Sequence, residues 1–109
     1  MAEMQFTDDN FEQEVLKEET MPVLVDFFAT WCPPCKILGP IIEELAKDFE
    51  GKVKIGKIDV DQNKKYAAQY GVQSIPTTIL FQNGEVLETL MGLQQKDKLE
   101  ELLNKQLKA

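Results

Sequence analysis

The sequence contains no histidine and no arginine, and it has only two cysteines in 109 residues. Without an imidazole, catalytic schemes that use a Ser-His or Cys-His pair are excluded, and so are metal sites built on histidine. Any chemistry must therefore use thiols, carboxylates or amines.

Positive charge is scarce, because twelve lysines face nineteen acidic residues and leave a net charge of −7. Proteins that bind nucleic acids or anionic membranes need a basic face for phosphate contacts, so we expect neither as a partner. The sequence also lacks an apolar run of the roughly 20 residues that a membrane-spanning helix requires.

The length and the first residues set two further expectations. A chain of 109 residues has the usual size of one domain, so we expect a single domain over residues 1–109. We also expect a monomer. The opening "MAEMQFTDDN" has no basic start, apolar stretch or small-residue cleavage site of a signal peptide. We therefore expect a cytoplasmic protein.

Strand-like and helix-like segments alternate along the chain. The hydrophobic pattern and the turn residues predict nine elements. The predicted strands are 3–6, 22–29, 52–60, 76–81 and 85–91, and the predicted helices are 8–19, 36–50, 61–71 and a C-terminal helix with Leu99, Leu102, Leu103 and Leu107 on one face. Alternating units favour parallel strands joined by helices, and Asn83-Gly84 predicts a hairpin that adds an antiparallel edge. The fold class is a three-layer α/β domain.

Both cysteines lie in the stretch "VDFFATWCPPCK" (25–36), between a predicted strand and a predicted helix. Two thiols at this spacing suit half of a zinc site, a redox pair or two small buried side chains. Structural zinc normally takes four nitrogen or sulfur ligands, and this chain offers two, so we expect no metal. A turn beside two prolines lies at the surface, which disfavours purely structural cysteines.

The redox interpretation explains the position of the thiols. At the start of a helix, unpaired backbone N–H groups and the helix dipole stabilise a thiolate, which is the attacking species in disulfide exchange. Cys32, at the predicted cap, is the better-placed nucleophile. Cys35 lies one turn further in, and we expect it to be more buried and to resolve the mixed disulfide.

An ordered set of motifs resembles the thioredoxin family over essentially the whole chain. It consists of "WCPPCK" after "VDFFAT", "DVD" closing a strand, "IPT" opening the next strand and a glycine after the last strand. The resemblance implies the thioredoxin fold, with a central mixed sheet of about five strands and about four helices in an α/β/α arrangement. It also implies a reductase of protein disulfides that binds no cofactor and receives electrons from NADPH through a separate thioredoxin reductase.

Two further residues are candidates for the catalytic site. Asp26 lies in the middle of the apolar "VLVDFF", where burial should raise the pKa of its carboxyl, although an Asp that only ends the strand fits too. The resemblance implies that Asp26 is a general base or proton relay for Cys35. Lys57, in the neighbouring predicted strand, is the natural counter-charge, and an exposed strand lysine is the alternative.

The residues predicted to bind substrate come mainly from the resemblance. Trp31 suits an apolar docking surface beside the thiols, although a packed aromatic fits as well. In thioredoxins the proline that matches Pro76 is cis, which implies a cis bond and a backbone at Ile75 that pairs with an extended substrate. The resemblance also places Gly92 beside the thiols, where the lack of a side chain lets substrate approach. The two prolines between the thiols are the remaining residues predicted to bind substrate. These prolines are Pro33 and Pro34.

Pro33 replaces the glycine that thioredoxins usually carry between the cysteines, and this bears on the redox potential. Pro33 favours an extended Cys32, as an N-cap requires, whereas Pro34 disfavours a helical Pro33. The sign of the net effect does not follow from the sequence. The alternatives to a reductase are an exported disulfide oxidant or isomerase and a thioredoxin-like binding module without turnover.

Overall fold

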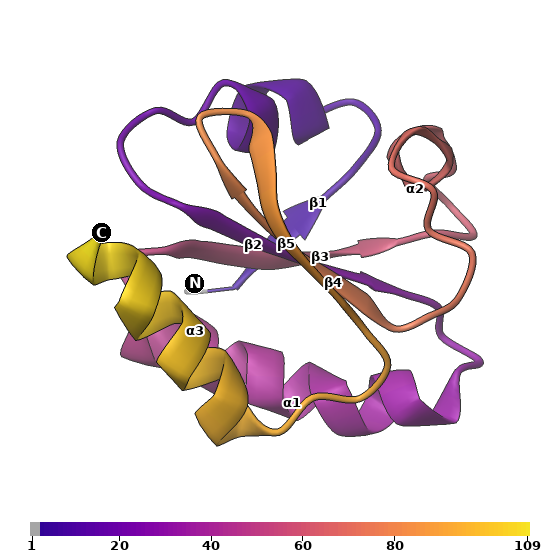
Figure 1. Cartoon of the computed structure of the whole chain (residues 1–109). Coiled ribbons are helices and arrows are strands. Elements are labelled where there is room, and N and C mark those ends of the chain that lie inside the picture. Colours follow the sequence, from indigo (N-terminus) through magenta and orange to yellow (C-terminus); the bar gives the residue numbers. More distant parts are fainter. Residues whose placement is uncertain (1–2) are drawn as a thin grey trace.

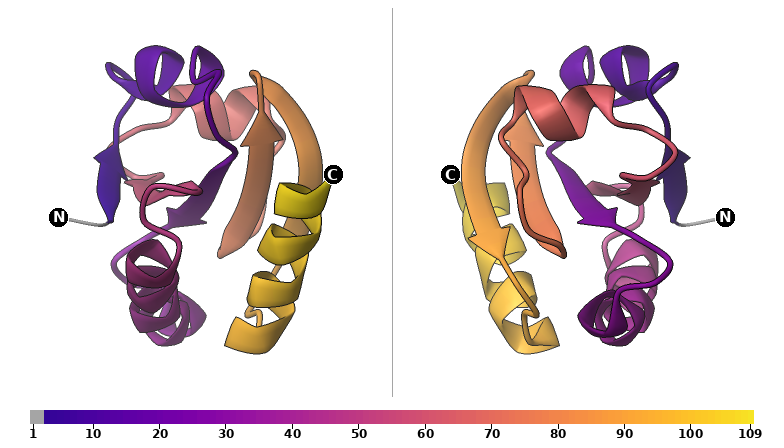
Figure 2. Two further views of the ribbon diagram at one scale, coloured as in Figure 1. Left: turned by 90° about the vertical axis from the view of Figure 1, so that its left-hand side faces the viewer. Right: turned by 90° about the vertical axis from the view of Figure 1, so that its right-hand side faces the viewer.

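The computed structural model describes residues 3–109, which form a sheet with helices on both faces (Figure 1). The elements of this part are β1 (Met4–Phe6), η1 (Glu12–Leu16), β2 (Val23–Phe28), α1 (Pro33–Asp48), β3 (Lys54–Asp59), α2 (Lys65–Gln69), β4 (Thr77–Gln82), β5 (Glu85–Met91) and α3 (Lys96–Lys108). The views in Figure 2 place η1 and α2 over one face and α1 and α3 over the other. The predicted three layers are confirmed, with five strands and four helices in the described residues. No helix in this range is long and apolar enough to span a membrane.

The sheet is mixed, with the strand order β1-β3-β2-β4-β5. The first three strands in this order run parallel, whereas β4 runs antiparallel to β2 and β5 antiparallel to β4. The expectation that a helix would join β3 to a parallel β4 is therefore wrong. The five residues of α2 rise only about 7.5 Å, whereas a six-residue strand spans roughly 20 Å, so the helix does not carry the chain back along the sheet. As a result, β4 begins at the edge where β2 and β3 end.

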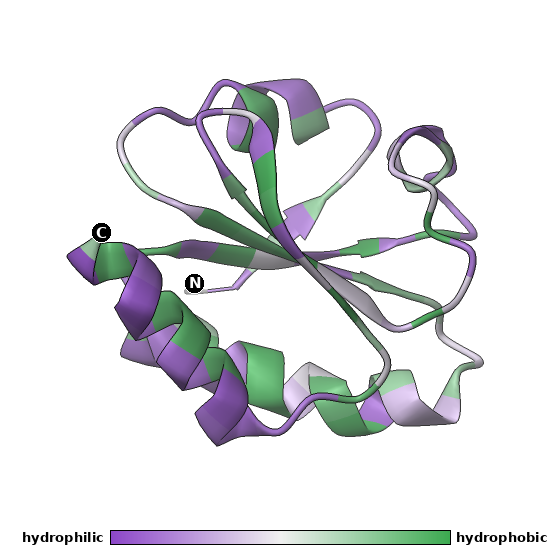
Figure 3. Ribbon diagram, in the orientation of Figure 1, coloured by the Kyte–Doolittle hydropathy of each residue, from purple (hydrophilic) through white to green (hydrophobic). Residues whose placement is uncertain are grey.

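The strand β2 is buried on both faces, as its sequence predicts. Val25 and Phe27 pack with Phe11 on the face covered by η1, and Leu24 packs with Leu38 of α1 on the other face. Figure 3 shows the corresponding pattern, because the central strands are mainly hydrophobic and α3 alternates between hydrophobic and hydrophilic residues. The two clusters hold β2 rigidly at the centre of the fold, directly before the cysteines.

The helices predicted at 8–19 and 61–71 are shorter in the structure, where η1 and α2 have five residues each. Before η1, the Asn10 side chain accepts a hydrogen bond from the Thr7 N–H at 2.7 Å, and the Thr7 hydroxyl accepts one from the Asn10 N–H at 3.2 Å. Before α2, the Asn63 side chain accepts a hydrogen bond from the turn that precedes η1. Thr7 and Asn10 thus form a reciprocal cap, and the Thr7 carbonyl accepts a hydrogen bond from the Phe11 N–H at 2.9 Å, so the chain already turns at Thr7 although η1 begins at Glu12.

The hairpin between β4 and β5 turns at the predicted residues. Asn83 and Gly84 have φ values of 53° and 78°, the left-handed conformation that this type of turn requires at both positions. In the C-terminal helix, Leu99 and Leu103 are buried as expected, whereas Leu107 near its end is exposed. The hairpin fixes β5 as the edge strand and carries the chain to Gly92, beside the cysteines' end of the sheet.

Candidate active site

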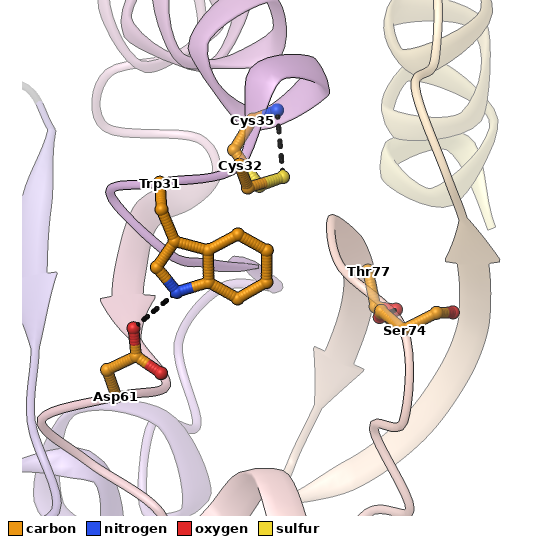
Figure 4. Close-up of a disulfide and its surroundings, with 6 residues drawn as sticks. All are labelled: Trp31, Cys32, Cys35, Asp61, Ser74 and Thr77. Carbon is orange, nitrogen blue, oxygen red and sulfur yellow. Dashed lines mark hydrogen bonds between the residues drawn. A yellow bond between two sulfur atoms is a disulfide. The ribbon is translucent and has the colours of Figure 1, made fainter.

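The two cysteines lie at the N-terminus of α1, after β2 (Figure 4). Cys32 is the N-cap residue, with an extended backbone (φ −90°, ψ 112°), and Pro33 begins the helix. A residue before proline favours an extended backbone, and proline fits the first helical position because an N–H there has no helical partner. The predicted placement of Cys32 at the cap is confirmed, and Pro34 is accommodated in the same helical turn.

The sulfurs of Cys32 and Cys35 form a disulfide, and the Cα atoms lie 5.2 Å apart. The backbone N–H of Cys35 donates a hydrogen bond to the Sγ of Cys32 at 3.3 Å. This N–H is one of the donors that the first turn of a helix leaves unpaired, and it points at the sulfur of the cap residue. After reduction, the same donor and the helix dipole favour negative charge on Cys32.

Both sulfurs lie beneath the surface of the turn. Cys32 is 2% exposed and Cys35 is 5% exposed, so the expectation that Cys35 is the more buried residue is wrong for this disulfide state. The cause is packing, because both side chains form an apolar cluster with Ala29, against which Ile75 also packs. The turn itself is at the surface, as predicted. Its exposed residues include Trp31, Pro33 and Pro34.

Trp31 projects from this turn with 64% of its surface exposed, so it is not a packed core aromatic. Its indole N–H donates a hydrogen bond to Asp61 Oδ2 at 2.7 Å (Figure 4). The N–H of Asp61 in turn donates to Asp59 Oδ1 at 2.9 Å, which fixes the acceptor after β3. Asp61 is the last residue of the "DVD" motif, but its contact with Trp31 was not predicted, because the two residues are 30 positions apart and meet only where β2 and β3 end at one edge.

The loop before β4 forms the other side of the site. The Ile75-Pro76 peptide bond is cis, as the resemblance implied. The Thr77 hydroxyl donates a hydrogen bond to the Ser74 carbonyl at 2.6 Å. The N–H of Gly92 donates to the Pro76 carbonyl at 2.8 Å, so the end of β5 is joined to this loop. Gly92 has a φ of 85°, a conformation that other residues rarely adopt, which explains a glycine here.

Asp26 lies inside the sheet, and the strand continues past it to Phe28. Its side chain is 1% exposed, and within residues 3–109 neither carboxylate oxygen has a hydrogen-bond partner. This burial raises the pKa of Asp26 from 3.8 to about 7, against the opposing effect of Lys57 and with an added contribution from Glu3. The predicted burial of Asp26 is confirmed.

Lys57 pairs with Asp26 in the register of β2 and β3, so the two side chains share one face of the sheet. The ion pair of Lys57 is not with Asp26, however. Its ammonium lies 3.7 Å from Glu3 Oε1 and 5.3 Å from the centre of the Phe28 ring. The sequence predicted a counter-charge for Asp26 here, and the structure adds Glu3 as a competing partner.

A pocket of about 310 Å³ lies between the start of α1 and the ends of β2 and β3. Cys35 and Lys57 both line it, together with Glu43 of α1. Cys35 and the lysine opposite Asp26 therefore face one solvent-accessible space. This space offers a path for protons between the buried part of the site and water.

The thioredoxin family profile matches residues 2–105. The chain belongs to the thioredoxin family. A thioredoxin of Rickettsia bellii is 54% identical over 98 residues, which cover 90% of this chain and 92% of the relative. A thioredoxin of Staphylococcus aureus is 49% identical over 107 residues, 98% of this chain and all of the relative. Thioredoxin 1 of a Nostoc species is 43% identical over 97% of this chain and 98% of its own length.

The family and the disulfide together establish the reaction. This thioredoxin is a thiol–disulfide oxidoreductase, and its activity is the reduction of protein disulfides. The mixed sheet and its two helical layers are those of the thioredoxin fold. Thioredoxins generally carry no cofactor, act on proteins that contain disulfides and are recharged by a reductase.

Proposed function

We propose that Cys32 is the nucleophile of this thioredoxin and that Cys35 resolves the mixed disulfide. The observation that carries this assignment is the hydrogen bond from the Cys35 N–H to Cys32 Sγ at the start of α1. A donor aimed at one sulfur lowers the free energy of the thiolate on that sulfur, and thiolate is the species that attacks a disulfide.

In the first step, the Cys32 thiolate attacks one sulfur of a substrate disulfide. A bond forms between Cys32 and that sulfur, the substrate disulfide breaks, and the other substrate sulfur leaves as a thiolate. In the second step, the Cys35 thiolate attacks Cys32 Sγ and releases the first substrate sulfur. The substrate gains two electrons, and the Cys32–Cys35 disulfide forms. Because Cys35 is already in place, this step is effectively unimolecular.

Asp26 is proposed as the base that accepts the proton of the Cys35 thiol before the second step. Lys57 is proposed as the positive charge that lowers the pKa of Asp26. A general base works best when its pKa lies near the working pH, and that of Asp26 is about 7. The pocket supports this assignment, because Cys35 lines it together with Lys57, which lies opposite Asp26 in the sheet.

The proposed substrate surface surrounds the disulfide. It comprises Trp31, Pro33, Pro34, Ile75, Pro76 and Gly92. Trp31 offers an exposed apolar face, and the backbone at Ile75 pairs with an extended segment of substrate as an added strand. The absence of a side chain at Gly92 leaves room for that segment, since nothing lies within 4 Å of the position that a Cβ would take.

Replacing Asp61 with alanine is expected to lower kcat/KM for insulin reduction by about fivefold, through a higher KM. The reason is that one hydrogen bond of about 1 kcal/mol holds the indole of Trp31 in place. Asp61→Asn, which keeps an oxygen acceptor, is the matched control. The fluorescence anisotropy of Trp31, the single tryptophan, should fall in Asp61→Ala. Parent-like kinetics and anisotropy in Asp61→Ala would count against this surface.

The remaining parts of the proposal concern the setting of the reaction. We propose that the chain works as a monomeric single domain in the cytoplasm and that NADPH supplies its electrons through a separate thioredoxin reductase. A reducing compartment suits this direction of electron flow.

Equilibration with glutathione buffers tests this setting. The expected midpoint potential is below about −200 mV, near the range of reducing thioredoxins, and a bacterial thioredoxin reductase should couple NADPH oxidation to insulin reduction. A midpoint near −120 mV with no coupling to the reductase would instead assign the chain to the disulfide oxidants. Such a shift would have to be explained by Pro33, the one residue between the cysteines that differs from the usual thioredoxin motif.

A further inference from the structure

The start of β1 places a carboxylate beside the charged residues of the site. β1 runs parallel to β3, with Met4 opposite Gly56 and Gln5 opposite Lys57. The close approach depends on Gly56, because a Cβ there would collide with the Met4 carbonyl oxygen. This pairing holds Glu3 over the end of the Lys57 side chain.

Glu3 is only 13% exposed in its side chain, and Lys57 is 22% exposed. Glu3 Oε1 lies 3.7 Å from Lys57 Nζ. The second oxygen, Oε2, is buried, and within residues 3–109 it has no hydrogen-bond partner. Burial raises the pKa of Glu3, against the attraction of Lys57. Such a carboxylate is a strong competitor for the nearest cation, because no other group of the described residues pairs with it.

The ammonium of Lys57 therefore has two buried carboxyl groups near it, those of Glu3 and Asp26. Two charged groups act on Asp26: Lys57 from β3 and Glu3, the residue before β1. From α1, Lys36 and Glu43 line the pocket that Lys57 also lines. From β4, Thr78 lies opposite Asp26 in register, and within residues 3–109 its buried hydroxyl has no hydrogen-bond partner. Of the two carboxylates, Glu3 has the ion pair.

We propose that Glu3 is a positioning residue of this active site, which holds the ammonium of Lys57 away from Asp26 and adds a second negative charge near the buried carboxyl group. The proposal rests on the role of Asp26 as the base for Cys35. Its effect on the reaction follows from electrostatics, because an unpaired buried carboxylate binds a proton more strongly than a paired one.

Neutralising Glu3 is the direct test. In Glu3→Gln, Lys57 is free to pair with Asp26, so the midpoint of the Asp26 titration should fall by about half a pH unit or more. The measurement is the ¹³C shift of the Asp26 carboxyl in NMR spectra of the intact oxidised protein. Glu12→Gln, which breaks the exposed Glu12–Lys17 pair and changes the net charge equally, should leave the midpoint unchanged.

The pH profile of insulin reduction gives the second readout. If Asp26 must be ionised to accept a proton, Glu3→Gln should raise the ratio of activity at pH 6 to that at pH 8 by about two- to threefold. In a Lys57→Gln background, the effect of Glu3→Gln on the Asp26 midpoint should shrink by more than half, because the shared cation is absent.

The outcomes separate the two proposals. An unchanged Asp26 midpoint in Glu3→Gln, with the fold intact by circular dichroism, overturns the role of Glu3. An equal shift with and without Lys57 overturns the part of the proposal that acts through Lys57. A lowered midpoint with an unchanged pH profile supports the electrostatic role of Glu3 and rejects Asp26 as the base.

Discussion

Insulin reduction is expected to fall to the uncatalysed background when Cys32 is replaced with serine. A serine hydroxyl is not ionised at neutral pH and does not form the mixed disulfide, so the first exchange step is lost. The standard turbidity assay with dithiothreitol measures this loss. Among the changes considered for this thioredoxin, it has the largest effect on activity.

Cys35→Ser is the matched variant, because it removes one sulfur from the same turn and leaves the attacking one. Here the first step proceeds and the second does not, so a mixed disulfide between Cys32 and the substrate should accumulate and be visible on non-reducing gels. If Cys32→Ser accumulated that adduct and Cys35→Ser did not, the two roles would have to be exchanged.

Replacing Asp26 with asparagine is expected to stabilise the protein strongly above neutral pH. Because burial raises the pKa of Asp26 from 3.8 to about 7, the folded state holds a proton between these values that the unfolded state has lost. The free energy of unfolding of the parent therefore decreases as the pH rises through this window. At about 1.36 kcal/mol per unit, the full effect is on the order of 4 kcal/mol.

Denaturant unfolding at several pH values measures this effect. Asp26→Asn should differ little from the parent near pH 4 and be more stable by up to about 4 kcal/mol at pH 8. Asp9→Asn, at an exposed position, is the control and should show no such trend. The same Asp26→Asn protein should lose reductase activity, since Cys35 loses its base. A stability difference that is independent of pH would show that Asp26 is ionised with little cost in the folded state.

Much of the fold follows from local sequence patterns. Short runs of apolar and β-branched residues predict the strands and the Asn83-Gly84 turn predicts the hairpin, because each pattern acts within a few residues. The direction of β4 does not follow, since its apolar residues fit a parallel or an antiparallel neighbour equally well. In the structure, the five residues of α2 are too few to carry the chain back along the sheet, and β4 runs antiparallel to β2.

In the active site, too, the local features follow from the sequence and the long-range contacts do not. The spacing of Cys32 and Cys35 before a helix predicts the pair and its cap, because those effects are local. The contacts of Trp31 with Asp61 and of Lys57 with Glu3 join residues that are distant in the sequence. They depend on which strands are neighbours in the sheet, so the sequence analysis missed both acidic partners.

The central claim is that the first turn of α1 holds the sulfur of Cys32 as a thiolate when the disulfide is reduced. Brief alkylation of the reduced protein with iodoacetamide at pH 6, followed by mass spectrometry, tests it most directly. The account predicts that Cys32 reacts at least about tenfold faster than a cysteine in an unstructured peptide, faster than Cys35, and with parallel loss of activity. A Cys32 that reacts no faster than the peptide, in a protein that stays active after its alkylation, would contradict the account.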